Sequence, residues 1–223
     1  MRALIIIVLL ALTGCTSSPE MMGSQDSADV AAETVQRADS INLFLRHKQP
    51  ISGNDLQHFL RVKSSLDNND VADAVANCVA LNKTHVMPSQ WYVLCGDVYL
   101  RSSTESAQQA AASFYHLAIQ RQPYNYHAHN RLAGVLRQQG RFGDALQHYD
   151  LALQAWPDFT PAYRNRAILF DLYIGDKVAA LNDYHAYQTL LARRGDASHQ
   201  VKGWIADLTR QIEDLSQVAK HAD

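Results

Sequence analysis

The sequence has few of the residues that interrupt helices, with 10 glycines and 6 prolines among 223 residues. So few breakers leave room for long helices and argue against a β-sandwich, which needs many turns. An excess of positive charge is also missing, because 20 lysines and arginines are set against 22 acidic residues. We therefore expect no nucleic-acid partner. The hydrophobic content of 47% argues against disorder and fits one domain or a short repeat array.

A long apolar run occurs at the N-terminus, where residues 3–12 are all hydrophobic. The run is too short to cross a membrane and is typical of the core of a signal peptide. It leads into Leu12-Thr13-Gly14-Cys15, which resembles the bacterial lipobox. The resemblance implies that residues 1–14 are removed as a signal peptide and that Cys15 is lipidated. The alternative is an ordinary secretory signal in which the cysteine is incidental.

The segment that begins at this cysteine, residues 15–26, lacks an apolar period and is predicted to be a flexible, lipidated tether. Thr16 stands where enterobacterial lipoproteins of the inner membrane have an aspartate, so the sequence resembles the class that is sorted to the outer membrane. We therefore expect a lipid-anchored protein of the cell envelope, held at the outer membrane with the rest of the chain in the periplasm.

The strongest signal after residue 80 is internal repetition. Three pairs of residues are spaced by 34 positions: Tyr115 and Tyr149, Ala133 and Ala167, and Pro123 and Pro157. Around them, aromatic and small residues recur at helical spacing. This pattern resembles the tetratricopeptide repeat (TPR). The resemblance implies an all-α fold, a short right-handed superhelical solenoid of helix-turn-helix units.

The resemblance also divides the chain into parts. We expect an N-terminal helix and a degenerate TPR-like helix pair in residues 27–88, three TPR units in residues 89–195, and a C-terminal capping helix in residues 196–223. In the third unit, the turn before Gly175 holds one extra residue and Arg166 replaces the usual leucine. Apolar stripes mark the two terminal helices: Ala31, Val35, Ala38, Ile41 and Leu45 in the first, and Val201, Trp204, Ile205, Leu208, Ile212, Leu215 and Ala219 in the last.

Ten histidines raise the question of a metal site. His127 and His129 are two residues apart, so they point to nearly opposite sides of a helix, with His129 in the core and His127 outward. His116, His148 and His185 fall on three different second helices. No HExxH, CxxC, GxSxG, Walker or GxGxxG motif occurs. We expect no enzyme, catalytic residue, metal or cofactor, and a histidine-based metallohydrolase is the weakest alternative.

TPR domains bind extended peptides in a concave groove lined by the first helices of successive units. By this resemblance, the candidate groove is lined by Asp97, Arg101, His127, Asn130, Arg131, Arg137, Arg164, Asn165 and Ile168. The lining mixes arginines with amides, and it only loosely resembles the carboxylate-clamp repeats because their lysines are missing. An ordinary solvated helix face is the alternative. Tyr173 is expected on the opposite, convex face.

Two cysteines remain after lipidation, in a compartment that is oxidising. Cys78 is expected on the second helix of the degenerate pair and Cys95 on the first helix of the next unit, and such helices are neighbours in a solenoid. A disulfide between them and two buried thiols are both compatible with the sequence.

Taken together, these features predict a membrane-anchored periplasmic TPR scaffold or adaptor that binds other proteins of the cell envelope. The alternative is a structural or pilotin-like subunit of a pilus, secretion or outer-membrane assembly machine. The membrane is contacted through the lipid anchor only, and the sequence does not identify the protein partner.

Overall fold

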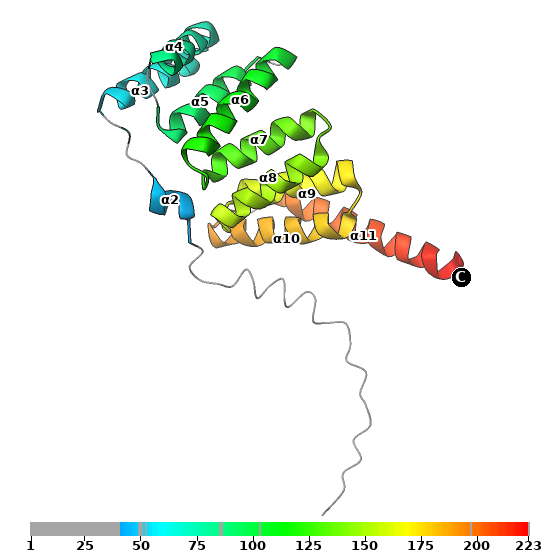
Figure 1. Cartoon of the computed structure of the whole chain (residues 1–223). Coiled ribbons are helices and arrows are strands. Elements are labelled where there is room, and N and C mark those ends of the chain that lie inside the picture. The colour runs from blue at the N-terminus through cyan, green and yellow to red at the C-terminus, as the bar shows by residue number, and fades with distance from the viewer. Residues whose placement is uncertain are drawn as a thin grey trace, which may run out of the picture. The chain divides into compact units, whose positions relative to one another are not determined.

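A computed structural model describes residues 41–48, 51, 53–84, 87–102, 104–196 and 198–222. Every regular element in these residues is a helix (Figure 1). Cys15, the tether and residues 31–40 of the N-terminal stripe lie outside the described residues. No helix within the described ranges is long and apolar enough to cross a membrane.

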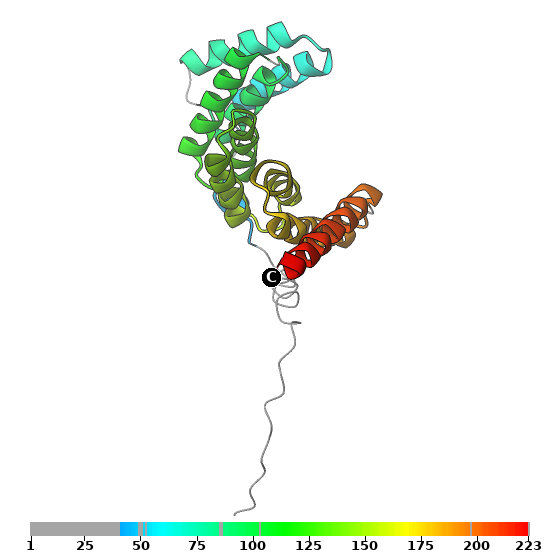
Figure 2. The ribbon, with the colours of Figure 1, turned by 90° about the vertical axis from the view of Figure 1, so that its right-hand side faces the viewer.

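The helices form successive pairs that pack against one another in chain order. The pairs are α3 (Gly53–Asp67) with α4 (Val71–Thr84), α5 (Ser89–Tyr99) with α6 (Glu105–Arg121), α7 (Tyr126–Gln138) with α8 (Phe142–Ala155), and α9 (Thr160–Leu169) with α10 (Lys177–Arg193). A short helix, α2 (Leu43–His47), precedes them and a long one, α11 (His199–Ala222), follows. Figure 2 shows the pairs following one another from α3 to α11. The predicted all-α repeat fold is confirmed.

Local sequence signals set several of the helix boundaries. Thr104, Asn125 and Asp176 each accept a hydrogen bond from the backbone N–H three residues later, which caps α6, α7 and α10. Gly140 follows α7 with a φ of 75°, and Gly175 ends the first helix of the third unit with a φ of 85°. Both values lie in the left-handed region that favours glycine, so the chain turns there at little cost.

Small residues let the two helices of each pair approach closely. The alanines at these positions are all fully buried: Ala111, Ala133, Ala145, Ala167 and Ala180. The tightest approach is at Gly96, where an added Cβ would lie 2.4 Å from Cε1 of Tyr115. The small residues that recur in the sequence are thus the points where paired helices come closest.

The extra residue before Gly175 is accommodated by a π-helical turn. α9 continues beyond Leu169 as η1 (Phe170–Ile174), and the N–H of Gly175 donates to the carbonyl of Phe170 at 2.8 Å. A π-turn takes up one residue without ending the helix. The buried alanines on either side therefore keep their places, while the side chains of η1 are turned to new directions.

The N-terminal helix differs from the predicted stripe. α2 buries Phe44, whose ring meets Tyr126 of α7 edge to face with centroids 5.6 Å apart. Ile41 and Leu45, which the stripe placed inside, are 53% and 58% exposed, so that part of the prediction is wrong. The reason is that α2 packs on the aromatic residues at the start of α7, and this contact selects a different side of the helix.

The last helix, α11, covers α10 with the first half of its apolar seam. Val201 and Leu208 are buried, and Trp204 packs on Tyr184 with ring centroids 5.2 Å apart. Leu215, from the second half of the seam, is 63% exposed. The capping role is thus confirmed near the start of α11, and the burial expected for Leu215 is wrong because α11 has 24 residues and α10 only 17.

A disulfide joins the degenerate pair to the first TPR unit. Cys78 of α4 and Cys95 of α5 are bonded, with their Cα atoms 5.7 Å apart. Both residues are fully buried in the core cluster that also contains Val62 and Trp91. Of the two alternatives that the sequence left open, the structure contains the bridge.

Candidate functional site

A polar cluster joins Asp97 and Tyr115 of the first TPR unit to Arg131 of the second, and we call it the Asp97 cluster. Tyr115 Oη donates a hydrogen bond to Asp97 Oδ1 at 2.7 Å. Nε of Arg131, from the next first helix, pairs with the same carboxylate oxygen at 3.0 Å. Burial and the charge of Asp97 raise the pKa of Tyr115, so its hydroxyl remains a donor. The cluster ties α5, α6 and α7 together through one carboxylate.

Tyr149 holds the place of Tyr115 in the second unit, but its hydroxyl has no partner. The side chain is fully buried and Oη makes no hydrogen bond. Gly134 follows the buried alanine of α7 and so stands where Asp97 stands in α5, and an added Cβ there would meet nothing within 4 Å. Burial raises the pKa of Tyr149 to about 12. The second unit therefore has the donor without the acceptor that the first unit supplies.

Arg137 lies one turn after Gly134 on α7, where the π-turn holds it. Its guanidinium carbon is 5.3 Å from the ring centroid of Tyr173 in η1, and that ring also packs on Phe142. Nε of Arg137 is buried and has no hydrogen-bond partner. Tyr173, which the sequence was expected to place on the convex face, thus lies beside Arg137 of α7 and Phe142 of α8.

A second cation, Arg164, comes from α9 and is exposed. Burial raises the pKa of Tyr149, whereas the charges of Arg137 and Arg164 act in the opposite direction. The two arginines come from successive first helices, α7 and α9, and their charges act on the same tyrosine. We call Gly134, Arg137, Tyr149, Arg164 and Tyr173 the Tyr149 site.

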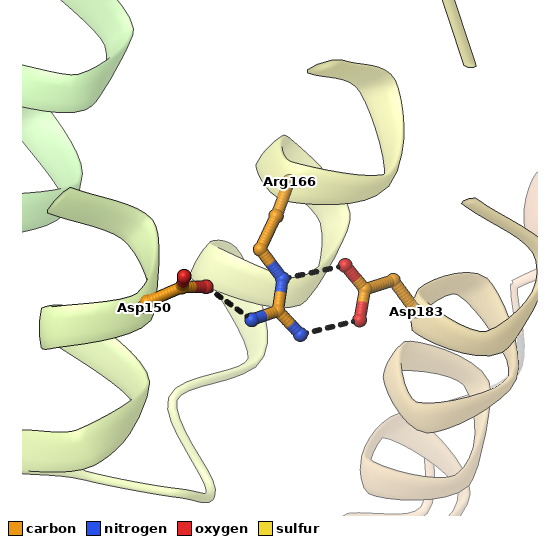
Figure 3. A network of polar contacts seen from close by, with 3 residues as sticks. All are labelled: Asp150, Arg166 and Asp183. Carbon is orange, nitrogen blue, oxygen red and sulfur yellow. Dashed lines mark hydrogen bonds and ion pairs between the residues drawn. The ribbon is translucent and has the colours of Figure 1, made fainter. Parts of the chain in front are cut away.

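Next to this site, Arg166 of α9 bridges two neighbouring helices (Figure 3). Its guanidinium donates two hydrogen bonds to Asp183 of α10, both at 2.7 Å, and one to Asp150 of α8 at 2.5 Å. Burial raises the pKa of Asp183, and the two hydrogen bonds from Arg166 oppose that rise. The residue that replaces the usual leucine therefore fixes α9 between α8 and α10, which also positions Arg164.

Histidines from α6, α7 and α8 meet beside the second unit, which their places on separate helices did not predict. Nε2 of His129 donates to the carbonyl of Pro123 at 2.9 Å, which leaves Nδ1 to accept from Nδ1 of His148 at 2.9 Å. The ring of His116 lies 6.3 Å from that of His148, centroid to centroid. Burial lowers the pKa of His129, and it lowers that of His148 to about 4. Neither these histidines nor any other group of three or more His, Cys, Asp or Glu side chains in the described part of the chain is arranged so that it could hold a metal ion.

The remaining candidate groove residues are divided between surface and interior. His127 and Arg101 are exposed, and Asn165 Nδ2 donates to Oδ1 of Asn130 at 3.0 Å. Asn130 is only 6% exposed, and Ile168 packs on the core cluster around Tyr184 and Val201. The expectation that Asn130 lines an open groove is wrong, because its side chain is buried and bonded to Asn165 of α9. Ile168 is only partly buried, and its place in the groove stays a prediction.

Three members of the Tyr149 site were missed by sequence reasoning: Gly134, Tyr149 and Tyr173. In the sequence, Tyr149 is one of the positions repeated at a spacing of 34, and its ring is indeed buried. The signal that was available is the difference between Asp97 and Gly134 at the same repeat position, since it removes the acceptor of a buried hydroxyl. The position of Tyr173 carried no such signal, because it depends on the π-turn.

Comparison with solved structures finds a similar fold in several proteins, TPR domains among them. A MamA RS-1 ArsTM double mutant has a TM-score of 0.60 and 12% identity over 77% of this chain and 92% of its own. The first TPR of Spaghetti (RPAP3), bound to HSP90 peptide SRMEEVD, has 0.50 and 16% over 56% and 93%. The Sgt2 TPR domain from Aspergillus fumigatus has 0.50 and 17% over 59% and 85%. No protein-family model and no curated protein sequence matches the chain.

At these identities the shared feature is the fold. The described helix pairs are therefore those of an all-α TPR solenoid.

Proposed function

We propose that the protein is a membrane-anchored scaffold that binds segments of other proteins of the cell envelope. The TPR fold supports a binding role. The observation that carries the proposal is that two successive first helices present arginines, the partly exposed Arg137 of α7 and the exposed Arg164 of α9. Charged side chains on neighbouring first helices of a repeat stack suit the recognition of an oppositely charged segment.

A neighbour of the same fold supports a peptide as the ligand. The TPR domain of RPAP3 is bound to an HSP90 peptide whose printed sequence, SRMEEVD, contains three acidic residues. In this chain the Tyr149 site is cationic, because it contains two arginines and no acidic side chain. The partner segment that suits this surface is therefore extended and acidic.

The proposed anchor is a lipid on Cys15, with the repeat domain in the periplasm at the outer membrane. Its support is the order of apolar run, small residues and cysteine in residues 3–15, together with Thr16. Two or more acyl chains hold a protein stably to a membrane. Cys15→Ser should release the chain from membranes or leave it unprocessed, as cell fractionation would show. A serine variant that is processed and fractionates fully with the outer membrane contradicts the anchor.

Binding is tested by capture from chemically cross-linked envelopes, using the tagged full chain as bait. We expect Arg137→Ala with Arg164→Ala to lose most of the captured partner. Arg210→Ala is the matched control, because Arg210 is an exposed arginine that pairs with Asp207 on α11, away from the site. If the double variant and the control capture equal amounts, binding does not use the Tyr149 site.

A second candidate function, a fixed subunit of an envelope machine, is favoured by the far end of α11. Leu215 and Val218 are 63% and 67% exposed there, which leaves an apolar surface on the last turns. In that case Leu215→Ser with Val218→Ser should release the chain from a large complex, as size-exclusion chromatography of envelope extracts would show, while the arginine variants stay bound.

A further inference from the structure

The short helix α2 packs on the repeat stack out of chain order. Its one buried residue, Phe44, belongs to the core cluster that contains Tyr126 of α7 and Phe159, the residue before α9. The helices α3 to α6 lie between α2 and this cluster in the sequence, and Figure 1 shows α2 separated from α3. α2 therefore meets the repeats as a separate segment would, and not as a further member of the stack.

The aromatic surface beneath Phe44 is held together by contacts that do not involve Phe44. The ring of Tyr126 lies 4.9 Å from that of Trp156 and 4.5 Å from that of Phe159, centroid to centroid. The rings of Trp156 and Phe159 stack at 5.7 Å. We call Tyr126, Trp156 and Phe159 the aromatic socket. Because the ends of α7, α8 and α9 fix these three rings, the socket should keep its shape when Phe44 leaves.

Few interactions hold α2 in the aromatic socket. Ile41 and Leu45, near Phe44, are 53% and 58% exposed. A helix of five residues does not persist alone, so burial of one phenylalanine has to offset the ordering of the whole segment. The side-chain nitrogens of Asn42 and of Gln90, which lines a narrow cleft with Phe44, are buried without a hydrogen-bond partner. Such unmet donors are costly, so α2 is a replaceable occupant.

The contacts of α2 define the kind of segment that the aromatic socket accepts. Nε2 of Gln122 donates to the backbone carbonyl of His47, the last residue of α2, at 2.8 Å. The carbonyls in the last turn of a helix have no partner within the helix, so this bond recognises the end of any helical turn. Phe44 precedes that carbonyl by three residues. A matching segment therefore carries a phenylalanine three residues before the end of a short helix.

We propose that the aromatic socket is a second binding site, which takes a phenylalanine-bearing helical turn of a partner protein, and that α2 occupies it until such a segment replaces it. Tyr126 begins α7 whereas Arg137 lies near its end, about 16 Å away along the helix axis. The inference therefore goes beyond the proposed function and does not depend on the arginines.

The probe is a blocked, fluorescently labelled peptide with the sequence of residues 41–48, titrated into the purified full chain and followed by anisotropy. The Phe44→Ala chain has an empty socket, so it should bind the peptide at least about tenfold more tightly than the wild type. Leu45→Ala is the matched control, because Leu45 is exposed and its loss leaves α2 in place. The same peptide with alanine in place of Phe44 should bind to none of these chains.

A second variant empties the socket without removing a core residue. Leu45→Pro removes the N–H that Asn42 caps and moves Phe44 out of the helical conformation, so it should bind the peptide as Phe44→Ala does. Melting temperatures close to that of the wild type show that the repeats stay folded in both variants. If neither variant binds the peptide more tightly than the wild type, the proposal is overturned.

Sedimentation and partner capture distinguish the remaining outcomes. A wild-type dimer that Phe44→Ala abolishes would show that α2 serves a second copy of the chain, which overturns the proposal. In capture from cross-linked envelopes, Phe44→Ala should raise the amount of partner, and the peptide of residues 41–48 should remove the increase. An unchanged amount shows that the socket binds only α2, while the proposed function stands. Loss of capture in the variant lacking Arg137 and Arg164 tests that function separately.

Discussion

The first and second TPR units carry a tyrosine at the same repeat position, but only in the first unit does its hydroxyl have a hydrogen-bond acceptor. Tyr115 donates to Asp97, which also binds Arg131. Tyr149 has no acceptor, because Gly134 provides none. The comparison teaches that stacking of repeats requires only their apolar and small positions. The position after the small residue can therefore vary, so that the tyrosine hydroxyl has an acceptor in the first unit and none in the second.

On both sides of the second unit, neighbouring helices are joined by specific links between side chains. On one side the Cys78–Cys95 disulfide joins α4 to α5. On the other, Arg166 bridges Asp150 and Asp183. The second unit therefore has a covalent link between helices on one side of it and an ion-pair link on the other.

The largest expected effect on stability comes from removing the ion pairs that Arg166 makes in the third unit. Arg166→Leu, which restores the usual residue, should cost about 3–5 kcal/mol of unfolding free energy because Asp183 is left buried and unpaired. Urea denaturation of the full chain measures this loss. Arg166→Leu combined with Asp183→Leu should recover most of it, and a double variant as unstable as the single one would contradict the ion-pair explanation.

A smaller loss should follow from removing the disulfide on the other side. Cys78→Ser with Cys95→Ser should cost about 3 kcal/mol, the value typical of a loop of this length. In protein purified without reductant and unfolded in denaturant, thiol titration should detect neither of these two cysteines. Detection of both thiols would show that the pair is reduced and that this region is held by packing alone.

The glycines of α5 and α7 sharpen the comparison further, because replacing each with alanine should change the stability of the protein in opposite directions. Gly96→Ala should destabilise the protein by about 1–3 kcal/mol, since the new Cβ meets the ring of Tyr115. Gly134→Ala should stabilise it by about 0.5–1 kcal/mol, because alanine favours the helix and meets nothing there. Denaturant titrations of both variants provide the test, and equal signs would contradict the difference between the two units.

The smallest expected effect is a pH dependence of the second unit. Burial lowers the pKa of His148 from 6.5 to about 4, with further lowering by His129 and His116 and by Arg141, and an opposing effect of Asp144. Below pH 6.5 the unfolded chain binds more protons than the folded one, so stability should fall as the pH decreases from about 6.5 towards 4. Melting temperatures across this range measure the slope.

His148→Gln is the control for the pH effect, because it removes the titrating ring and keeps a hydrogen-bonding side chain. Its melting temperature should fall less steeply than that of the wild type between pH 6.5 and 4. Identical slopes would assign the acid sensitivity to other groups.

The sequence by itself determined the helix pairs, the buried small positions and the extra residue of the third unit. These features depend on spacing within one helix or one turn, so they can be read locally. Caps such as Asn125 and Asp176 and the left-handed glycines Gly140 and Gly175 act within a few residues as well. The predicted anchor at Cys15 has the same local character and stays a prediction.

Only the tertiary structure decided which polar groups are satisfied. Phe44 meets Tyr126, His129 meets His148, and Arg137 meets Tyr173 across separate helices. Each contact depends on how two helices are rotated relative to one another, and the contact of Arg137 with Tyr173 depends also on the π-turn. Neither feature has a period in the sequence. For the same reason the open site was not predicted: a buried hydroxyl without a partner is recognised only when all the neighbouring atoms are known.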